Sequence, residues 1–401
     1  MLRLLTTAAF LTAAAVSESR YKQVGKRLVG PTGFTGPPYY PTTQGSWSVS
    51  LSPDGAVLAM APYNQSWSQQ PPSSTTSVFR YSGIQYEPVG ESTLLSDGAT
   101  SVSANGTYLA MGSYFKLQGH ITLPGGVFHY NDGGYHQVDV YDDHVGVKLS
   151  DGGVLSADGT HLATTTKWSS AVTSQGMTYS QPEEIGIFVY SGFAYHGSGI
   201  PSWTIDPWCL ANFLPWRLSL DGTILNIGPC VFNQGRPIPV PTKGTGCLGT
   251  CFAPTSTALS SDGLVLAIGY SDDDDGIGAA WVFRYNVEVR EYNQVGDKLV
   301  GTGVGSPPHQ GTSVSLSSDG SILAVGGPYY NVGIGAVWLY RYDGNTYQQF
   351  GDRIVASDYG TQQGNAVSLS SDGTLLAVGG KGQTGGGVAW VFRSETEPNP
   401  R

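Results

Sequence analysis

The stretch Gly311-Thr-Ser-Val-Ser-Leu-Ser-Ser-Asp-Gly-Ser-Ile-Leu-Ala-Val-Gly-Gly-Pro328 decides the fold. Residues 312–316 alternate polar and apolar side chains, with Val314 and Leu316 on one face, as in a half-buried β-strand. Asp319-Gly320 then predicts a tight turn, because Asp hydrogen-bonds its local backbone and Gly accepts a positive φ. Residues 322–326 are continuously apolar, which predicts a second strand covered on both faces.

Two more strands are predicted after this pair. Residues 335–342 (Gly-Ala-Val-Trp-Leu-Tyr-Arg-Tyr) alternate again, Asp343-Gly-Asn345 turns the chain, and residues 347–355 continue as a fourth strand. Four antiparallel strands joined by short turns form one blade of a β-propeller.

The Asp-Gly turn recurs along the chain and counts the blades. Its seven copies begin at Asp54, Asn105, Asp158, Asp221, Asp262, Asp319 and Asp372. Asn105 replaces Asp without changing the turn, because Asn favours the same conformation. A repeat of roughly 40–50 residues is typical of propellers. We therefore expect an all-β fold, a seven-bladed β-propeller of four-stranded antiparallel blades.

A second motif, Tyr-x-Gln-Val-Gly, predicts how the ring closes. It marks the fourth strand at Tyr292 and Tyr347, and a further copy, Tyr21-Lys-Gln-Val-Gly25, precedes the first blade. The last blade ends after its third strand, residues 388–393, and has no copy of its own. The N-terminal strand is therefore expected to complete the C-terminal blade, which leaves no long exposed edge.

These motifs resemble the FG-GAP repeats of integrin-α-type propellers. The resemblance rests on Gly311-x-x-Val-x-Leu, Asp319-Gly320, Leu323-Ala-Val-Gly-Gly-Pro328 and Gly335-Ala-Val, and it extends over nearly the whole mature chain. It implies a seven-bladed ring that binds partners through its loops. Most loops after the second strand lack the Asp-rich calcium pattern of that family. The Ser-Pro-Asp-Gly phrase at Asp54 is also similar to WD40 repeats, although the spacing is longer and no Trp-Asp dipeptide occurs.

The two ends of the chain predict its destination. Residues 1–17 have the basic start, short apolar run and small residues of a signal peptide. Residues 18–393 are expected to form a single propeller domain, and residues 394–401 a polar C-terminal tail. No other stretch reaches the ~20 apolar residues of a membrane span. We therefore expect a secreted, extracellular protein with no membrane span.

Composition narrows the range of partners. The sequence has 56 Gly and 23 Tyr, 12% charged residues and a net charge of −10. Nucleic-acid binding requires basic patches, so no nucleic-acid partner is expected.

All four cysteines, Cys209, Cys230, Cys247 and Cys251, fall in the fourth blade. In an oxidising compartment an even, clustered set favours disulfides, and we favour Cys209–Cys230 with Cys247–Cys251. Three connectivities remain open. A zinc site is the alternative, although no His lies at ligand spacing.

The acidic loop Ser271-Asp-Asp-Asp-Asp-Gly276 is a candidate calcium site. Calcium takes several oxygen ligands, and Asp273 and Asp275 alternate ahead of a Gly. The corresponding loops of the two following blades, residues 328–333 and 381–385, carry no acid, so a solvated acidic loop is the alternative. Calcium is the one cofactor that the sequence suggests.

Aromatic residues outside the repeat are candidate ligand contacts, because exposed rings stack on sugars and anchor interfaces. They are Trp47, Trp67, Trp168, Trp203 and Trp208. The alternative is that they cover irregular blade edges. By contrast, Trp281, Trp338 and Trp390 repeat at one third-strand position and are expected to pack between blades. Asn64 and Asn105 begin glycosylation sequons.

No catalytic motif is present: the sequence lacks H-E-x-x-H, G-x-S-x-G and a P-loop. We therefore expect a secreted binding or adhesion module that recognises a glycan or an extracellular protein through its blade loops. One alternative is an extracellular carbohydrate-active hydrolase or lyase, which would need carboxylates, or a His with a carboxylate, converging at the mouth of the central funnel. Another is a purely structural extracellular protein. The sequence leaves the ligand and the oligomeric state open.

Overall fold

A computed structural model describes most of the propeller but not the chain ends. The described residues are 21–30, 46–63, 75–89, 94–95, 100–111, 116–117, 126–138, 140–142, 147–149, 153–168, 172–174, 177–180, 182–191, 195–197, 203–204, 216–227, 230–234, 236–240, 254–303, 307–355, 360–382 and 387–395. The predicted signal peptide and the last six residues of the tail lie outside them. Within them, no helix is long and apolar enough to cross a membrane.

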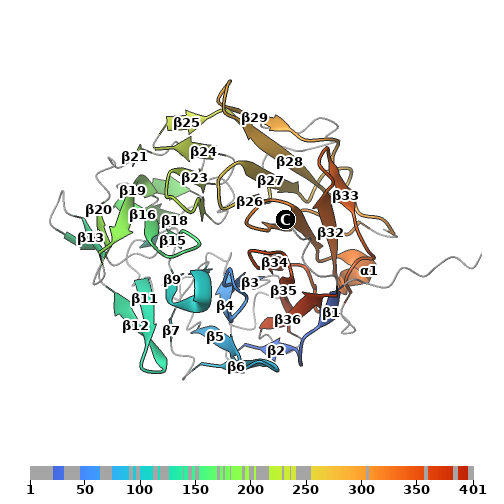
Figure 1. Cartoon of the computed structure of the whole chain (residues 1–401), viewed down its shortest axis with the longest axis horizontal. Helices are drawn as coiled ribbons and strands as arrows, with labels where there is room; N and C mark the ends of the chain where they lie inside the picture. Colours follow the sequence, from blue (N-terminus) through green and yellow to red (C-terminus); the bar gives the residue numbers. More distant parts are fainter. Residues whose placement is uncertain are drawn as a thin grey trace, which may run out of the picture.

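Seven antiparallel blades surround a central axis, so the predicted fold is confirmed (Figure 1). Blade 1 contains β3 (Ser46–Leu51), β4 (Val57–Tyr63), β5 (Thr75–Tyr81) and β6 (Tyr86–Pro88), with β7 (Leu94–Leu95) on β5. Blade 2 contains β8 (Thr100–Val102), η1 (Ala104–Gly106), β9 (Tyr108–Met111), β11 (Gly126–Asn131) and β12 (Gly134–Val138). Blade 3 contains β15 (Gly153–Leu155), β16 (His161–Trp168), β19 (Pro182–Tyr190) and β20 (Tyr195–Gly197), extended by β13 (Val140–Asp142), β14 (Val147–Leu149) and β21 (Trp203–Thr204).

The remaining blades are more regular. Blade 4 contains β22 (Arg217–Leu218), β23 (Ile224–Ile227), β24 (Cys230–Asn233) and β25 (Arg236–Ile238). Blade 5 contains β26 (Ser256–Leu259), β27 (Val265–Tyr270), β28 (Ala279–Asn286) and β29 (Glu291–Gln294). Blade 6 contains β30 (Ser313–Leu316), β31 (Ile322–Gly327), α1 (Tyr330–Gly333), β32 (Ala336–Tyr342) and β33 (Tyr347–Gln349). Blade 7 contains β34 (Ala366–Leu369), β35 (Leu375–Lys381) and β36 (Gly387–Ser394).

Blade 7 is completed by the N-terminal strand, as the repeated motif predicted. Strand β1 (Tyr21–Gln23) pairs with β36 in the register Tyr21↔Ser394, and β2 (Leu28–Val29) pairs further along the same strand. The ring therefore closes by joining the two ends of the chain in one sheet.

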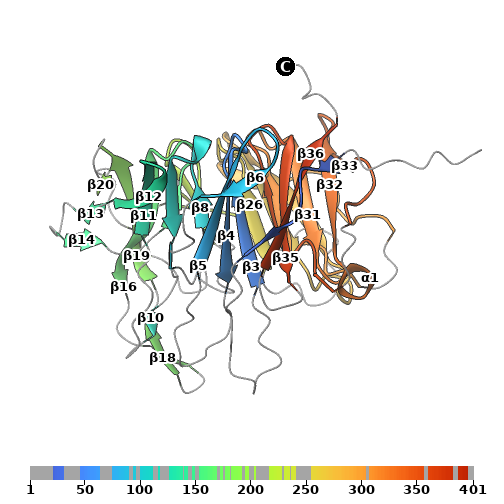
Figure 2. The same ribbon diagram turned by 90° about the horizontal axis from the view of Figure 1, so that it is seen from below.

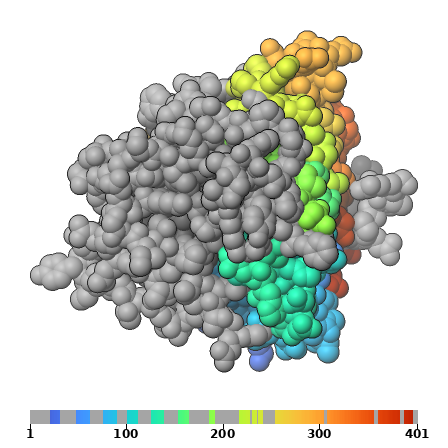
Figure 3. All heavy atoms as spheres, turned by 90° about the vertical axis from the view of Figure 1, so that its left-hand side faces the viewer, coloured from blue at the N-terminus to red at the C-terminus, as the bar shows by residue number. Residues whose placement is uncertain are grey.

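The two faces of the ring differ in character (Figure 2). The face that carries the Asp-Gly turns, between the first and second strands of each blade, is called the turn face. The opposite face, called the loop face, carries the connections between the second and third strands, including α1 and the small sheet of β10 (Lys116–Leu117), β17 (Val172–Ser174) and β18 (Met177–Ser180). From the side, successive blades follow one another in chain order (Figure 3).

The apolar core lies between the blades, where facing sheets bury their side chains. Trp281, Trp338 and Trp390 are at most 3% exposed, and each lies in a core cluster with residues of the preceding blade, so the prediction that they pack between blades is confirmed. The Trp338 ring lies against the backbone of Gly301, where an added Cβ would clash.

Arginines of the third strands join neighbouring blades at the surface. The guanidinium of Arg80 lies over Tyr130 of blade 2, that of Arg284 over Tyr342 of blade 6, and that of Arg393 over Tyr81 of blade 1. Cation–π contacts of this kind contribute about 0.5–1 kcal/mol at exposed sites.

Each Asp-Gly turn is fixed by a buried serine two residues before the Asp. In blade 6 the Ser317 hydroxyl donates to Asp319 Oδ1 at 2.8 Å and accepts the Ile322 N–H at 2.9 Å. The Ser–Asp bond recurs in every blade except blade 2, where the turn residue is Asn105. The glycine of each of the seven turns has φ between 66° and 76°, a conformation that favours Gly.

The two repeated motifs meet within a blade. The fourth-strand tyrosine donates its hydroxyl proton to the carbonyl of the turn glycine, as in Tyr135 to Gly106 at 2.7 Å and Tyr292 to Gly263 at 2.5 Å. Tyr21, Tyr86 and Tyr347 make the same bond. Burial raises the pKa of these tyrosines, that of Tyr135 to about 12.

The turn face also carries a ring of hydrogen bonds between blades, called the turn ring. It uses the residue between Ser and Asp (or Asn) in each turn: Pro53, Ala104, Ala157, Leu220, Ser261, Ser318 and Ser371. The bonds run from Ala104 to Ala157 and, in an unbroken series, from Leu220 through Ser261, Ser318 and Ser371 to Pro53. The Ser318 N–H donates to the Ser371 carbonyl at 2.9 Å, and the Ser371 N–H donates to the Pro53 carbonyl at 2.7 Å. Pro53 itself has no N–H to continue the pattern toward blade 2.

Candidate functional site on the loop face

Blades 5 and 6 are strapped together on the loop face. The loop of residues 271–278, between β27 and β28, runs beside residues 307–312, which enter blade 6. The His309 N–H donates to the Gly276 carbonyl at 2.8 Å, and the Gln310 N–H donates to the Ile277 carbonyl at 3.0 Å. This pairing holds the acidic loop against the start of the next blade.

A buried glutamine anchors the strap. The Gln310 side chain is fully buried, and its Oε1 accepts the Gly301 N–H at 2.6 Å while its Nε2 donates to the Gly301 carbonyl at 3.3 Å. Gln363 holds the equivalent position one blade later, where Gly335 pairs with it as Gly278 pairs with Gln310. The Gln-Gly dipeptide before the first strand is thus part of the structural repeat.

The residue before the glutamine is presented outward by a left-handed backbone. His309 has φ 54°, and Gln362 at the same position in blade 7 has φ 50°. Such a conformation is uncommon for residues other than Gly. Gly276 makes room for the imidazole, because a Cβ there would lie 3.0 Å from two of its ring atoms.

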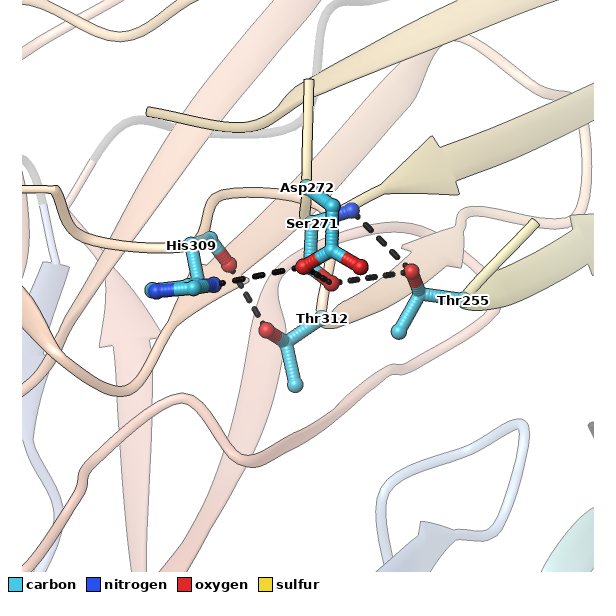
Figure 4. A network of polar contacts seen from close by, with 5 residues as sticks. All are labelled: Thr255, Ser271, Asp272, His309 and Thr312. Atoms are coloured by element: carbon cyan, nitrogen blue, oxygen red, sulfur yellow. Dashed lines mark hydrogen bonds and ion pairs between the residues drawn. The ribbon is translucent and has the colours of Figure 1, made fainter. Parts of the chain in front are cut away.

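Three side chains meet at this junction and are called the junction cluster: Asp272, His309 and Tyr329. His309 Nδ1 lies 3.6 Å from Asp272 Oδ1 (Figure 4). The His309 and Tyr329 rings are 4.9 Å apart between centroids. The Asp272 side chain is 72% exposed, the His309 side chain is 34% exposed, and Tyr329 is 40% exposed. The cluster therefore presents a carboxylate, an imidazole and an aromatic ring to solvent from two blades.

Hydroxyl groups position the cluster from below (Figure 4). The Ser271 hydroxyl donates to Asp272 Oδ1 at 3.3 Å and lies 3.0 Å from Thr255 Oγ1, which also accepts the Ser271 N–H. The Thr312 hydroxyl donates to the His309 carbonyl at 2.7 Å. These contacts fix the Asp272 carboxylate and the His309 backbone in place.

The first predicted calcium ligand, Asp273, lies beneath the surface in an ion pair. Its carboxylate is fully buried, and Lys298 Nζ lies 2.7 Å from Asp273 Oδ2. Blade 6 has Tyr330 and Arg353 at the equivalent positions, with the guanidinium 4.6 Å from the Tyr330 ring centroid. Both blades therefore place a basic side chain under this loop, against a carboxylate in one case and an aromatic face in the other.

The second predicted ligand, Asp275, lies in the turn with φ 53°. Within the part of the chain that the structure describes, no group of three or more His, Cys, Asp or Glu residues could hold a metal ion. Calcium binding by Asp273 and Asp275 stays a prediction, and the described geometry assigns the Asp273 carboxylate to Lys298.

The structure does not describe the side chains of the five tryptophans that the sequence predicts as ligand contacts. Trp47 lies in β3, Trp168 in β16 and Trp203 in β21, but the described part of the chain does not include their side chains. Trp67 and Trp208 lie wholly outside it. Their contact with a ligand stays a prediction.

The described residues include one of the four cysteines and one of the two asparagines that begin glycosylation sequons. Cys230 lies in β24 and is disulfide-bonded, while Cys209, Cys247 and Cys251 lie outside the described residues, so the pairing stays a prediction. Asn105 is exposed, and its Oδ1 accepts the Thr107 N–H at 3.1 Å inside the tight turn. Asn64 is outside the described residues.

The centre of the ring bears on the enzyme alternative. A cavity of about 180 Å³ is lined by the innermost strands of all seven blades. Its described lining contains Ser, aliphatic side chains, Trp216 and Arg217, and it includes no Asp, Glu or His. The paired carboxylates that a funnel hydrolase requires are not among these residues.

Sequence reasoning missed His309. Asp272 belongs to the acidic run and Tyr329 to a Tyr-rich loop, but His309 is a single His with no neighbouring motif. The repeat could have identified it. His309-Gln310-Gly311 aligns with Gln362-Gln363-Gly364, and in this alignment His309 occupies the position that varies and faces outward.

Comparisons with known proteins add little to this geometry. No protein-family model matches the chain, and no curated protein matches it. The β-propeller domain of Myceliophteria thermophila Cps50 (Swd1) is similar in structure, with a TM-score of 0.49 and 13% identity over 88% of this chain and 97% of that one. A candidate 6-phosphogluconolactonase from Bacteroides uniformis gives a TM-score of 0.46 and 15% identity over 77% of this chain and 85% of that one. The FG-GAP resemblance stays a prediction, and the class of the protein, a seven-bladed β-propeller, rests on its own strand pairing.

Proposed function

We propose that the protein is a secreted, non-catalytic binding propeller that recognises a glycan through its loop face. The observation that carries this proposal is the junction cluster, in which Tyr329, His309 and Asp272 lie together and exposed at the seam of blades 5 and 6. Secretion is inferred from the N-terminal sequence pattern.

The chemistry of the cluster suits a sugar. An exposed aromatic ring offers a flat apolar surface to the C–H face of a pyranose. An ionised carboxylate has two oxygens that accept hydrogen bonds from hydroxyl groups, and an imidazole supplies one donor and one acceptor when neutral. The strap through Gln310 holds the loops that carry these groups against the neighbouring blade, which reduces the entropy lost on binding.

A protein partner is the second candidate, and Val332 is the observation that favours it. This β-branched residue at the tip of the blade 6 loop is 73% exposed and has φ 57°. Such a conformation is unusual for a β-branched side chain, and strained residues concentrate at functional sites.

A glycan-array screen of the mature secreted protein tests the proposal, run once in calcium and once in chelator beside an Asp272→Asn/Tyr329→Ala double variant. We expect specific binding by the wild type that the double variant loses. Binding that also disappears in chelator would support the calcium loop as well. A cooperative thermal transition shows that the wild-type sample is folded. If that sample binds no glycan in either buffer, glycan recognition is contradicted and the protein partner remains as the candidate.

A further inference from the structure

The central cavity has a chemical character of its own. It is lined by the inner strands of the seven blades and shares no lining residue with the junction cluster. Its volume of about 180 Å³ is well above the ~10–15 Å³ that a single buried water requires. A small ion with several oxygens would fit this space.

Serine hydroxyls provide most of its polar lining, and their oxygens are already engaged as acceptors. Ser368 Oγ accepts the Leu51 N–H of the next blade at 3.0 Å, and Ser315 Oγ accepts the Leu369 N–H at 3.0 Å. Ser101 Oγ accepts the Leu155 N–H at 3.2 Å. An oxygen that accepts a backbone N–H still carries a hydroxyl proton, so each of these serines keeps a donor that it can turn toward the cavity.

A second set of hydroxyls forms a relay on the turn ring. The Ser261 hydroxyl donates to Ser318 Oγ at 2.9 Å, and the Ser318 hydroxyl donates to Ser371 Oγ at 2.8 Å. The next residue of the ring is Pro53, which has no hydroxyl to receive the Ser371 proton. Chains of hydrogen bonds polarise one another, which makes the last hydroxyl a stronger donor.

One charged residue joins these donors. Arg217 lines the cavity from β22, at the strand position that Ser50, Ser315 and Ser368 occupy in their own blades. Its Nη1 donates to the Trp216 carbonyl at 2.9 Å, which helps to fix the side chain beside the cavity. A guanidinium presents donors in a planar fork that matches a carboxylate or a phosphate.

We propose that the central cavity is a binding site for a small oxyanion, held by Arg217 and by the hydroxyls of the blade 6 and blade 7 serines. The described lining offers donors and a positive charge and contains no carboxylate that would repel an anion. Phosphate, sulfate and a simple carboxylate share the required chemistry. The site is independent of the proposed glycan function, since it uses none of the same residues.

Isothermal titration of the folded mature protein tests the site, with inorganic phosphate, sulfate and acetate in separate arms at ionic strength matched by sodium chloride. The arms show which oxyanion class the cavity prefers. We expect saturable binding by the wild type and a Kd at least tenfold weaker for Arg217→Gln. The matched control is Arg236→Gln, which removes an exposed arginine from β25 of the same blade and should leave the Kd unchanged.

Two further variants keep the test decisive if Arg217→Gln does not fold. Arg217→Lys keeps the charge but not the fork, and Ser371→Ala removes the last hydroxyl of the relay; each should weaken binding severalfold while the thermal transition remains. The proposal is overturned if the wild type binds none of the three anions. It is also overturned if the folded Arg217 and Ser371 variants bind as the wild type does, or if Arg236→Gln loses affinity to the same extent.

Discussion

The hydroxyl of Tyr21, in the N-terminal strand, donates a hydrogen bond to the carbonyl of Gly373, which lies 352 residues further along the chain in the turn of blade 7. The same bond links Tyr347 to Gly320 within blade 6, where both residues belong to one continuous segment. The strand that closes the ring therefore reproduces the contact of an ordinary fourth strand, and the closed blade is equivalent to its neighbours.

Loss of the Tyr21 hydroxyl is expected to destabilise the ring. Tyr21→Phe keeps the buried ring but leaves the buried Gly373 carbonyl without this donor, which costs roughly 1–3 kcal/mol of unfolding free energy. Denaturant unfolding of Tyr21→Phe beside Tyr347→Phe measures the effect. Similar losses for the two variants would support closure, whereas a loss for Tyr347→Phe alone would show that the N-terminal strand does not complete blade 7.

The buried turn serine is expected to contribute as much to the free energy of unfolding as the Asp-Gly pair that follows it. Ser317→Ala removes the donor to Asp319 and the acceptor of the Ile322 N–H, so we expect a loss of roughly 1–3 kcal/mol. Ser82→Ala, in an exposed turn of blade 1, is the matched control and should change the unfolding free energy by less than about 0.5 kcal/mol. Equal effects of the two variants would show that the Ser317 bonds add nothing to stability.

Acid should destabilise the protein through its turn aspartates. Burial alone would raise the pKa of Asp372, but hydrogen bonds from Ser370 and Thr374 together outweigh it and hold the pKa below its ordinary value of 3.8. The pKa values of Asp158 and Asp221 are lowered in the same way, by serine and threonine donors acting against burial. The unfolded chain then binds protons at a higher pH than the folded one, so stability falls as the pH drops from about 4 through the folded-state pKa.

The variant Asp372→Asn isolates one such turn, because it removes the titration and keeps an acceptor oxygen, as Asn105 does in blade 2. Unfolding free energies at about pH 6 and about pH 3 should differ less in this variant than in the wild type. An unchanged difference would assign the acid sensitivity to other groups.

The buried pair of Asp273 and Lys298 yields a prediction that also tests calcium. Lys298→Met leaves a buried carboxylate without its cation, and we expect a loss of about 3 kcal/mol or more. The double variant Asp273→Tyr/Lys298→Arg copies the Tyr330–Arg353 contact of blade 6 and should recover most of that loss. A double variant no more stable than Lys298→Met would show that the two blades are not interchangeable here.

Thermal unfolding in calcium and in chelator tests whether the acidic loop binds calcium. With the Asp273 carboxylate held by Lys298, thermal unfolding of the wild type should give the same Tm in calcium and in chelator. A Tm that rises in calcium for the wild type but not for Asp273→Asn would instead support the calcium loop.

The fold could be predicted because the repeat records it many times over. Asp319-Gly320 and its copies locate the turns, the Tyr-x-Gln-Val-Gly motif locates the fourth strands, and the copy at Tyr21 predicts closure. A serine also stands two residues before the Asp, or before Asn105, in all seven turns, but no sequence pattern assigns it a role. Its role appears only when its oxygen is seen between a carboxylate and a backbone N–H.

The candidate site could be predicted only in part, because it is formed between blades. The sequence predicts Asp273 as a calcium ligand, and this stays a prediction. In the structure its carboxylate lies under the loop against Lys298, and the neighbouring Asp272 is the exposed carboxylate. His309 comes from the following blade, 37 residues after Asp272, and no local pattern joins the two. Contacts between two blades depend on the twist of each sheet and on how the sheets stack. The periodicity of a single strand carries no information about either.

The central claim, that the junction cluster binds a glycan, is tested most directly by the affinity of the best array glycan for four purified proteins. Titration of the wild type, Tyr329→Ala, Asp272→Asn and the turn-face control Glu288→Gln should give Kd values about tenfold weaker for the two cluster variants and unchanged for the control, a difference of about 1.4 kcal/mol. Equal affinities for all four folded proteins would contradict the claim and place the binding site elsewhere on the ring.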